Sequence, residues 1–582
     1  MTELGPRALV QAYREGRARP REVLERVYAQ IEREGVQPVW IHVRPFEAAL
    51  AALERAEREA KDGPLFGVPF AVKDNIDVAG MPTTAACPEF SYVPAHDAAV
   101  VARLLAAGAI AIGKTNLDQF ATGLVGTRSP YGVCSSVFDA RYLSGGSSSG
   151  SAIAVARGDV SFALGTDTAG SGRVPAAFNA LIGLKPTRGL LSSRGMVPAC
   201  RSLDCVSIFT RELGDAEAVL EVCAGYDPED ALSRRAPAPP PRLAARVRIG
   251  VPSAESLEFC GDCESARLFQ AAVARFAALP AELVEVDLRM FREAASLLYQ
   301  GPWVAERLAA LGAFFERSPE AIHPVVRSIL EGAKRYSARD AFEGSYRLAE
   351  LRRKTEPVWE QIDALLVPSV PTHYTIEDVL RDPIGLNTNL GIYTNFVNLL
   401  DLSALAIPEG FRANGLPFGV TLIGPAFADT ALLDLAGKHL QEPRPAPAKP
   451  AEGSVWLAVA GAHLSGQPLN HELVSRGARL IATTHTAAEY RLFALDTQPR
   501  KPGLVRASAG AGKPIEVEVW ELSQQAFGSF VAAIPAPMSI ATTRLADGSQ
   551  VKGFSCEPHA LEGALEISEY GGWRAFLAAQ PR

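Results

Sequence analysis

The sequence predicts a large α/β domain followed by a smaller α+β domain. Between about residue 65 and residue 440, short apolar segments alternate with helical ones, which is typical of a sheet covered by helices. The run "QEPRPAPAKPAEGS" at 441–454 is rich in Pro and Ala and has no apolar period, as expected of a linker. The segments after it are β-rich with turn signals. We therefore assign residues 1–440 to the first domain and 455–582 to the second.

The elements of the first domain follow from their patterns. Residues up to about 60 are rich in Ala, Glu, Arg and Leu, which favours amphipathic helices. The segments "FGVPFAVKDNI" and "VSFALGTDT" have apolar runs that end at polar turns, as buried strands do, and "DAAVVARLLAAGAIAIGKTNL" predicts a helix, a glycine stop and a strand. Residues 254–360 show helical periodicity, and "DALLVPSVP" and "LPFGVTLIGP" return to strands. The Pro-rich run at 235–243 indicates a surface loop inside the domain.

Composition excludes several classes of function. The chain has 582 residues, 48% hydrophobic and 21% charged, with a net charge of −7 and no long Lys/Arg block. We therefore expect no nucleic-acid or anionic-membrane partner. The absence of a signal-peptide core and of a long uncharged apolar run favours the cytoplasm. The eight cysteines are sparse, as in a reducing compartment, and the CxxC pair of Cys260 and Cys263 has no partner pair, so we expect no metal and no cofactor.

Two Gly/Ser clusters, "GGSSSGS" at 145–151 and "GTDTAGSGR" at 165–173, flank apolar segments. Glycine at the end of a strand lets the backbone turn sharply and approach a ligand, and successive N–H groups can form an anion nest. A nest beside a serine hydroxyl suits acyl transfer, because the tetrahedral intermediate carries an oxyanion. We interpret the clusters as two walls of one active site. We expect Ser148, Ser149 and Ser151 only to cap a helix or to pack.

A serine nucleophile requires a base. No histidine lies in this region, and the nearest on the N-terminal side is His96. Lys73 follows the apolar run "GVPFAV" and is flanked by Asp74 and Asn75. Burial lowers the pKa of a lysine, and only the neutral amine can act as a base. Lys73 is therefore the candidate base.

Together these motifs resemble the amidase signature family. The segment "AVKDNI" matches its lysine element, "GGSSSGS" its Gly-Gly-Ser-Ser-Gly-Gly element, and "GTDTAGSGRVPA" its Gly-Thr-Asp-x-Gly-Gly-Ser-x-Arg-x-Pro element. Ser147 and Ser171 stand 24 residues apart, which is the family's spacing between its two catalytic serines. The resemblance spans about residues 1–440 and implies a mixed central sheet covered by helices.

The resemblance implies a Ser-Ser-Lys triad. Ser171 would be the nucleophile, and Ser147, joined to its chain by a cis peptide in the family, would relay the proton. Lys73 would be the base and would help return a proton to the leaving ammonia. Asp167 and Arg173 would brace the loop. The backbone N–H groups of the implied oxyanion hole belong to Thr168, Ala169, Gly170 and Ser171.

The second domain narrows the substrate. An amidase domain followed by such a domain resembles the allophanate hydrolase branch of the family, and the tail resembles γ-glutamylcyclotransferase-like domains. The residues Val459-Ala460-Gly461 replace the nest of those domains, which counts against a cyclotransferase reaction. The implied reaction is hydrolysis of the terminal amide of urea-1-carboxylate (allophanate) to ammonia and N-carboxycarbamate, which goes on to ammonia and carbon dioxide. His471 is the candidate catalytic residue in the second domain, with helix capping as the alternative.

Allophanate carries a carboxylate, for which a bidentate arginine is the best geometric match. The segment "SLLYQGPWVAERLAAL" contains Tyr299 and Arg307, eight residues apart, so on one helix both would face the same side. They also match the positions where the allophanate hydrolase branch holds its substrate. The alternative is a surface arginine over an apolar helix. Gly123 in "FATGLVGT" would offer a backbone group near the scissile amide.

Other functions stay open on the sequence. One is a general small-molecule amidase, and another is an amidotransferase component that acts on charged tRNA, which normally lacks such a tail. A non-enzymatic scaffold is disfavoured, because Lys73, Ser147 and Ser171 are present together. Family analogy further implies a homodimer and a functional link to urea carboxylase.

Overall fold

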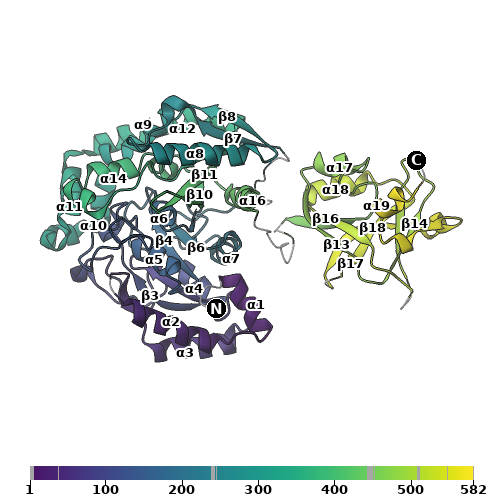
Figure 1. Ribbon diagram of the computed structural model, residues 1–582, viewed down its shortest axis with the longest axis horizontal. Helices are drawn as coiled ribbons and strands as arrows, with labels where there is room; N and C mark the ends of the chain where they lie inside the picture. Colours follow the sequence, from purple (N-terminus) through teal and green to yellow (C-terminus); the bar gives the residue numbers. More distant parts are fainter. Residues whose placement is uncertain are drawn as a thin grey trace. The chain divides into compact units, whose positions relative to one another are not determined.

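The computed structural model describes residues 5–36, 38–237, 241, 243, 246–441, 450, 453–507, 511–546 and 548–580. Contacts divide the chain into two compact units, one of residues 1–236 and 240–443 and the other of residues 237–239 and 444–582 (Figure 1). Most of the expected linker at 441–454 lies outside the described residues, as does part of the Pro-rich run at 235–243.

Within the described residues of the first unit, eleven strands form one sheet. They are β1 (Trp40–Val43), β2 (Pro69–Lys73), β3 (Ile110–Thr115), β4 (Phe162–Asp167), β5 (Ile182–Lys185), β6 (Cys205–Thr210), β7 (Val247–Pro252), β8 (Ala281–Val286), β9 (Ala364–Pro368), β10 (Ser403–Phe411) and β11 (Pro417–Gly424). Their order is β1-β3-β2-β4-β6-β5-β10-β11-β9-β7-β8. The sheet is mixed, because β2 runs parallel to β3 and β4, and β7 runs parallel to β8 and β9, whereas the other pairs are antiparallel.

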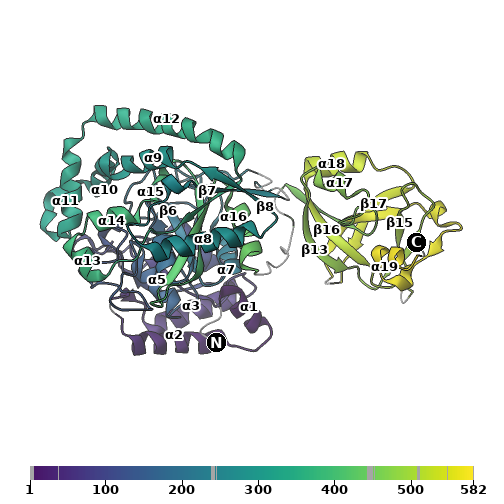
Figure 2. The same ribbon diagram turned by 45° about the horizontal axis from the view of Figure 1, so that its top comes forward.

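Helices surround this sheet (Figures 1 and 2). They are α1 (Pro6–Arg14), α2 (Pro20–Glu34), α3 (Phe46–Glu59), α4 (Ala99–Ala106), α5 (Ser149–Ala156), α6 (Val174–Phe178), α7 (Leu213–Cys223), α8 (Cys263–Ala277), α9 (Arg289–Gln300), α10 (Trp303–Arg317), α11 (Pro324–Gly332), α12 (Ala338–Gln361), α13 (Ile376–Arg381), α14 (Gly385–Leu390), α15 (Asn395–Leu399) and α16 (Asp429–Leu440). Several begin at proline, including α1, α2 and α11. Proline suits a first helical position, because its fixed φ fits the helix and its missing N–H would have no partner there.

Both faces of the sheet are covered. In β9, Leu366 packs into one hydrophobic core, whereas Leu365 and Val367 pack into a second core that includes residues of α9 and α12. Side chains alternate between the two faces of a strand, so this division shows one core on each side. Every residue of β9 is buried, which explains why such strands appear in the sequence as continuous apolar runs.

The parallel pairing of β2 with β4 positions the candidate site. Val72 of β2 lies opposite Leu164 of β4. The carboxyl ends of neighbouring parallel strands meet at one edge of a sheet, which is where ligands bind in open α/β sheets. Lys73 ends β2, and the loop that carries Ser171 follows β4. The two motifs are therefore brought to the same edge.

The second unit is β-rich. Its strands are β12 (Ser454–Val459), β13 (Arg479–His485), β14 (Tyr490–Ala494), β15 (Pro502–Arg506), β16 (Glu516–Ser523), β17 (Met538–Arg544), β18 (Gln550–Cys556) and β19 (Leu565–Glu566), and its helices are α17 (Asn470–Val474), α18 (Gln524–Ala532) and α19 (Trp573–Ala578). The strands form one sheet in the order β13-β16-β12-β18-β17 and another in the order β15-β14-β19. The two predicted fold classes, an α/β domain with a mixed sheet and an α+β domain, are confirmed. Over the described residues, none of the helices is both long and apolar enough to cross a membrane.

Candidate active site

Lys73 is fully buried at the end of β2. Its Nζ donates hydrogen bonds to Ser147 Oγ (2.8 Å) and Thr166 Oγ1 (2.7 Å). Burial lowers the pKa of Lys73 to about 7, although the negative charges of Asp118 and Asp204 oppose this change. An amine with a pKa near neutrality is partly unprotonated at pH 7, so Lys73 can take up a proton there.

Ser147 is buried and stands just before α5. A cis peptide bond joins it to Gly146, in agreement with the family resemblance. Gly146 is required by close packing, since a Cβ on it would lie 2.6 Å from the backbone nitrogen of Gly126. The chain thereby brings Ser147 Oγ to the Lys73 amine.

The other serines of the first cluster bond to backbone groups. Ser148 Oγ donates to the Thr166 carbonyl (3.1 Å) and accepts from the Thr166 N–H (3.3 Å). Ser151 Oγ donates to the Leu164 carbonyl (2.9 Å), and Ser149 Oγ also faces a backbone carbonyl (3.5 Å). These contacts attach α5 to β4 and its surroundings, which is a packing role.

Ser171 lies in the loop between β4 and α6 and is 2% exposed. Its Oγ donates a hydrogen bond to the Gly123 carbonyl (3.5 Å). Across the described residues, no hydrogen bond joins Ser171 Oγ directly to Ser147. The structure thus brings Gly123 to the expected nucleophile and joins Ser147 to Lys73.

A buried ion pair supports this loop. Arg173 Nε donates to Asp167 Oδ2 (3.0 Å) and Arg173 Nη2 donates to Asp167 Oδ1 (2.9 Å), with both side chains inaccessible to solvent. Burial favours the neutral acid, but the Arg173 guanidinium outweighs it and holds the pKa of Asp167 below its ordinary value. Asp167 also accepts the Gly172 N–H (3.0 Å). The Asp167–Arg173 pair therefore links the end of β4 to the residue just before α6, as expected of a pair that supports the loop.

The backbone N–H groups of the loop 168–171 differ in whether they already have a hydrogen-bond acceptor within the described residues. The Gly170 N–H donates to Asp167 Oδ1 (3.0 Å) and is therefore engaged within the loop. The N–H groups of Thr168, Ala169 and Ser171 donate to no acceptor in the described part of the chain. Of the four expected oxyanion-hole donors, three are therefore available and Gly170 is already used.

Arg307 is 2% exposed. Its guanidinium donates to Thr122 Oγ1 (3.2 Å) and to the Tyr299 hydroxyl (3.4 Å), and it lies 5.1 Å from the centre of the Tyr299 ring. Thr122 immediately precedes Gly123, which contacts Ser171. The buried guanidinium of Arg307 therefore contacts Thr122, the residue just before the Gly123 carbonyl that faces the expected nucleophile Ser171.

Tyr299 and Arg307 do not share one helix. The expected continuous helix is wrong, because α9 ends at Gln300 and α10 begins at Trp303. Gly301 and Pro302 separate the helices; proline lacks the N–H of a continuing helix and disfavours helical geometry in the preceding residue. The two side chains meet across this break.

Sequence reasoning missed Asp204. Its Oδ1 accepts the Thr168 hydroxyl, and its Oδ2 accepts the N–H groups of Ala199 (2.8 Å) and Cys200 (3.0 Å). Burial raises the pKa of Asp204 to about 6, although its hydrogen bonds and the Arg307 charge oppose this rise. No motif surrounds Asp204 in the sequence, and only the pairing of β6 with β4 brings it near Thr168.

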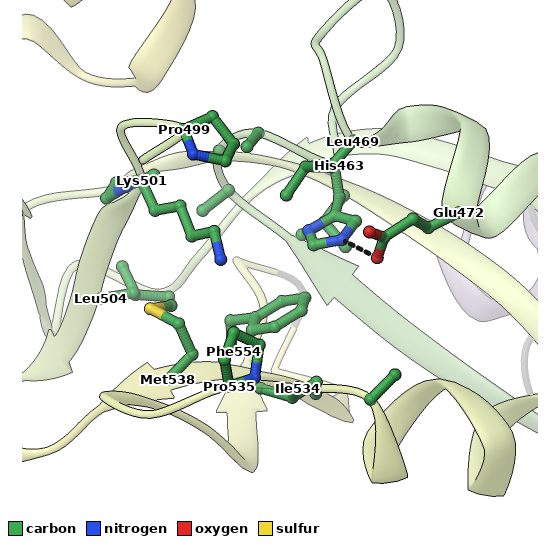
Figure 3. Close-up of a pocket in the computed structure, with 16 residues that line it drawn as sticks. His463, Leu469, Glu472, Pro499, Lys501, Leu504, Ile534, Pro535, Met538 and Phe554 are labelled. Carbon is green, nitrogen blue, oxygen red and sulfur yellow. Dashed lines mark hydrogen bonds and ion pairs between the residues drawn. The ribbon is translucent and has the colours of Figure 1, made fainter. Parts of the chain in front are cut away.

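The second unit contains a separate cavity of about 220 Å³ (Figure 3). Its polar lining includes His463, Glu472 and Lys501. His463 Nε2 lies 3.2 Å from Glu472 Oε2, and the imidazole stacks on Phe554 with ring centres 5.0 Å apart. Burial lowers the pKa of His463, although Glu472 opposes this shift. In Figure 3 the Lys501 side chain reaches into the cavity.

His471, the residue chosen from the sequence, is exposed on α17 and is not part of the cavity lining. Its Nδ1 lies 2.9 Å from the Pro468 carbonyl. The histidine of the cavity is His463, which follows the buried strand β12. A histidine just beyond a strand was a signal available in the sequence, whereas its pairing with Glu472 was not.

The cysteines of the CxxC pair belong to the first unit. Cys260 precedes α8 and Cys263 begins it, and both are exposed free thiols. In the described parts of the chain, no group of three or more His, Cys, Asp or Glu residues is arranged to hold a metal ion.

Residues 22–433 match the family Amidase, and residues 455–578 match the Allophanate hydrolase C-terminal domain. The chain is 45% identical to the urea amidolyase of Saccharomyces cerevisiae, over 94% of this chain and 32% of that protein. It is 39% identical to a glutamyl-tRNA(Gln) amidotransferase subunit of Symbiobacterium thermophilum, over 68% of this chain and 87% of that protein.

Solved structures show the same similarity. The allophanate hydrolase of Kluyveromyces lactis superposes with a TM-score of 0.82 at 41% identity, covering 98% of each chain. The K. lactis urea amidolyase superposes with a TM-score of 0.83 at 41% identity, covering 98% of this chain and 36% of that one. The chain thus spans about a third of the length of the urea amidolyases that it matches.

Proposed function

The chain belongs to the amidase family, and we propose that it is an amidohydrolase that cleaves the terminal amide of allophanate. The products are ammonia and N-carboxycarbamate. The observation that carries the proposal is the buried Arg307, hydrogen-bonded to Thr122 beside the Gly123–Ser171 contact. The match to the Allophanate hydrolase C-terminal domain and the similarity to K. lactis allophanate hydrolase support it.

Ser171 is the nucleophile in this proposal. Neutral Lys73 accepts a proton from Ser147, while Ser147 takes the proton of Ser171, whose hydroxyl rotates from Gly123 towards Ser147. The Ser171 oxygen then attacks the amide carbon. The resulting oxyanion is stabilised by free N–H groups of the loop 168–171. The proton held by Lys73 returns through Ser147 to the leaving nitrogen, which departs as ammonia, and water hydrolyses the acyl-enzyme by the same route.

Arg307 and Tyr299 hold the substrate carboxylate. A guanidinium presents several donors to a carboxylate, and burial strengthens the interaction by excluding water. Thr122 and Gly123 are adjacent in sequence, so the anion site and the nucleophile are close. This arrangement favours short carboxylated amides over neutral ones, and it distinguishes the proposal from a general amidase or a tRNA-directed amidotransferase.

The test measures ammonia release from allophanate, malonamate and a neutral amide without ATP or added metal. We expect strong preference for the two carboxylated amides. Arg307→Ala should lower kcat/KM for these by about a hundred-fold, since a charge-assisted hydrogen bond is lost, and should change the neutral amide little. Good turnover of neutral amides without turnover of allophanate would contradict the substrate assignment.

A second reaction is proposed for the cavity of the second unit. Lys501 supplies a cation for a carboxylate. The Glu472 carboxylate opposes the effect of burial on the pKa of His463 and favours a proton on its imidazole, so His463 is the proton donor in this proposal. N-carboxycarbamate would lose one carboxylate as carbon dioxide while its nitrogen takes a proton from His463. The carbamate left behind then yields ammonia and carbon dioxide.

The supply of substrate and the assembly are also proposals. Allophanate is a carboxylated urea, so a urea carboxylase must precede this reaction, and the relatives named urea amidolyase support that link. We expect the chain to act as a homodimer in the cytoplasm. Sedimentation equilibrium tests the dimer, and a mass of one chain at micromolar concentration would contradict it.

A further inference from the structure

The segment 199–204 touches the main parts of the candidate site. It runs between Val197, whose backbone exchanges hydrogen bonds with Asn75 (2.8 and 3.0 Å), and the start of β6. Asn75 stands two residues after Lys73. The segment itself closes a tight turn, because the Asp204 N–H donates to the Cys200 carbonyl (3.0 Å).

One end of the segment holds the oxyanion loop. Asp204 accepts the Thr168 hydroxyl through Oδ1 and the backbone N–H groups of Ala199 and Cys200 through Oδ2. Asn398 adds a second connection, since its Nδ2 donates to the carbonyls of Asp167 (2.8 Å) and Leu203 (2.9 Å). These contacts hold Thr168, a predicted oxyanion donor, against the turn.

The other side of the segment is attached to the helix of the anion site. Glu306 of α10 accepts the Ser202 N–H (2.7 Å), the Ser202 hydroxyl (2.7 Å) and the Cys200 thiol (3.0 Å). Glu306 is the residue before Arg307. The charges of Asp204 and Glu306 both stabilise the protonated Arg307. The turn is therefore hydrogen-bonded directly to this part of α10.

We propose that the segment 199–204 is a brace that couples binding of the substrate carboxylate at Arg307 to the geometry of the oxyanion loop. Asp204 and Glu306 are its two positioning residues, and neither touches the reacting atoms. The brace makes the carboxylate contribute to turnover as well as to binding, because correct placement of Arg307 and of the Thr168 N–H depends on one turn. The inference rests on the proposed function, since it needs a carboxylated substrate.

The experiment compares malonamate with propionamide, a pair that differs in the carboxylate. Glu306→Gln should lower kcat/KM for malonamate about ten-fold and for propionamide less than about two-fold, as expected for a small displacement of a positioned group. Ser202→Ala removes an exposed donor to Glu306, so it should act in the same direction by about three-fold. Asp204→Asn displaces an oxyanion donor and also breaks the coupling, so it should lower kcat about a hundred-fold on malonamate and less on propionamide, with little change in KM.

Coupling is measured with the double variant. In protein that already carries Asp204→Asn, Glu306→Gln should no longer alter the ratio of kcat/KM for malonamate to kcat/KM for propionamide, because the two residues act through one turn. Glu316→Gln, an exposed change on the same helix, is the control and should behave like the unsubstituted protein. Thermal unfolding verifies that each variant is folded. If a variant at a buried residue does not fold, Ser202→Ala, which changes an exposed residue, still tests the proposal.

Two results would overturn the brace. One is an equal loss of kcat/KM on malonamate and on propionamide in Glu306→Gln and Ser202→Ala. The other is a double variant whose loss of kcat/KM on malonamate equals the product of the losses in the two single variants. Failure of the proposed function looks different, because the unsubstituted protein would then show no preference for malonamate over propionamide.

Discussion

Lys73 and Lys114 show how the environment of a buried lysine decides its chemistry. Lys114 Nζ lies 3.0 Å from Asp74 Oδ1, and both side chains are inaccessible to solvent. Lys73 is as deeply buried but forms no ion pair with any described residue, and its partners are the hydroxyls of Ser147 and Thr166. Hydroxyls compensate a charge less than a carboxylate does. The pKa of Lys73 therefore falls to about 7, and it is the lysine suited to accept a proton.

The pH profile follows from this pKa. Lys73 acts as a base only after losing its proton, so kcat/KM should rise with pH and level off above about 7. Below that value it should fall about ten-fold per pH unit, because the neutral fraction falls in that proportion. Initial rates with malonamate between pH 5 and 9 measure this. A flat profile across pH 6 to 8 would exclude Lys73 as the base.

Ser171→Ala tests the nucleophile. Loss of the attacking oxygen should lower turnover of allophanate by at least about a thousand-fold, as for nucleophiles in other acyl-transfer triads. The circular dichroism spectrum should stay native, since among the described residues the Ser171 hydroxyl makes only a long hydrogen bond, to the Gly123 carbonyl. Ser148→Ala is a control for removal of a hydroxyl from the first cluster, and it should keep measurable turnover. Full activity of Ser171→Ala would refute the triad.

At the scale of elements, the loop after β4 is shaped by what its backbone can adopt. Gly170 has a φ of +135°, where residues with a side chain are strained, and a Cβ there would lie 2.5 Å from Thr394 Oγ1. The loop must therefore pass close to Thr394, and this passage directs the neighbouring N–H groups. A glycine at this position is explained by geometry alone.

Gly170→Ala should displace the oxyanion loop. We expect kcat to fall about a hundred-fold with a smaller change in KM, because misplaced oxyanion donors weaken mainly transition-state binding. Gly332→Ala is the matched control, since Gly332 ends α11, and a Cβ added there would meet no atom within 4 Å, so the change should be tolerated. Wild-type kcat in Gly170→Ala would show that the loop is not constrained as described.

The whole molecule consists of two units, each with a polar site of its own. The first has the Lys73–Ser147 contact, and the second has the cavity of His463 and Glu472. Two sites suit a reaction whose first product is itself unstable. The second site would act on what the first site releases.

His463→Ala in the full chain tests this division. The first ammonia should be released at the normal rate, and carbon dioxide should appear about a hundred-fold more slowly, the lower end of the loss expected when a proton donor is removed. Stopped-flow detection of carbon dioxide beside an ammonia assay measures both steps. His471→Ala should leave both rates unchanged. Equal slowing of the two products by His463→Ala would contradict separate sites.

Local sequence patterns were sufficient to predict the fold class, which the structure confirms, and they supplied the motifs whose family resemblance made Lys73, Ser147 and Ser171 the candidate site residues. Strand and helix periodicity, the spacing of Ser147 and Ser171, and the position of Lys73 after an apolar run are properties of short segments, in which burial and turn geometry depend on nearby residues. The break at Gly301-Pro302 is also a local property, because proline ends a helix, and the eight-residue spacing of Tyr299 and Arg307 does not imply one continuous helix.

Which distant groups meet was settled by the tertiary structure alone. Arg307 reaches Thr122 across 185 positions, and Asp204 reaches Thr168 across 36. His463 rather than His471 faces the cavity because the turn after β12 points it towards Glu472 and Phe554. Periodicity and spacing describe neighbours along the chain, whereas these contacts depend on strand order and on how segments pack, which no local pattern encodes.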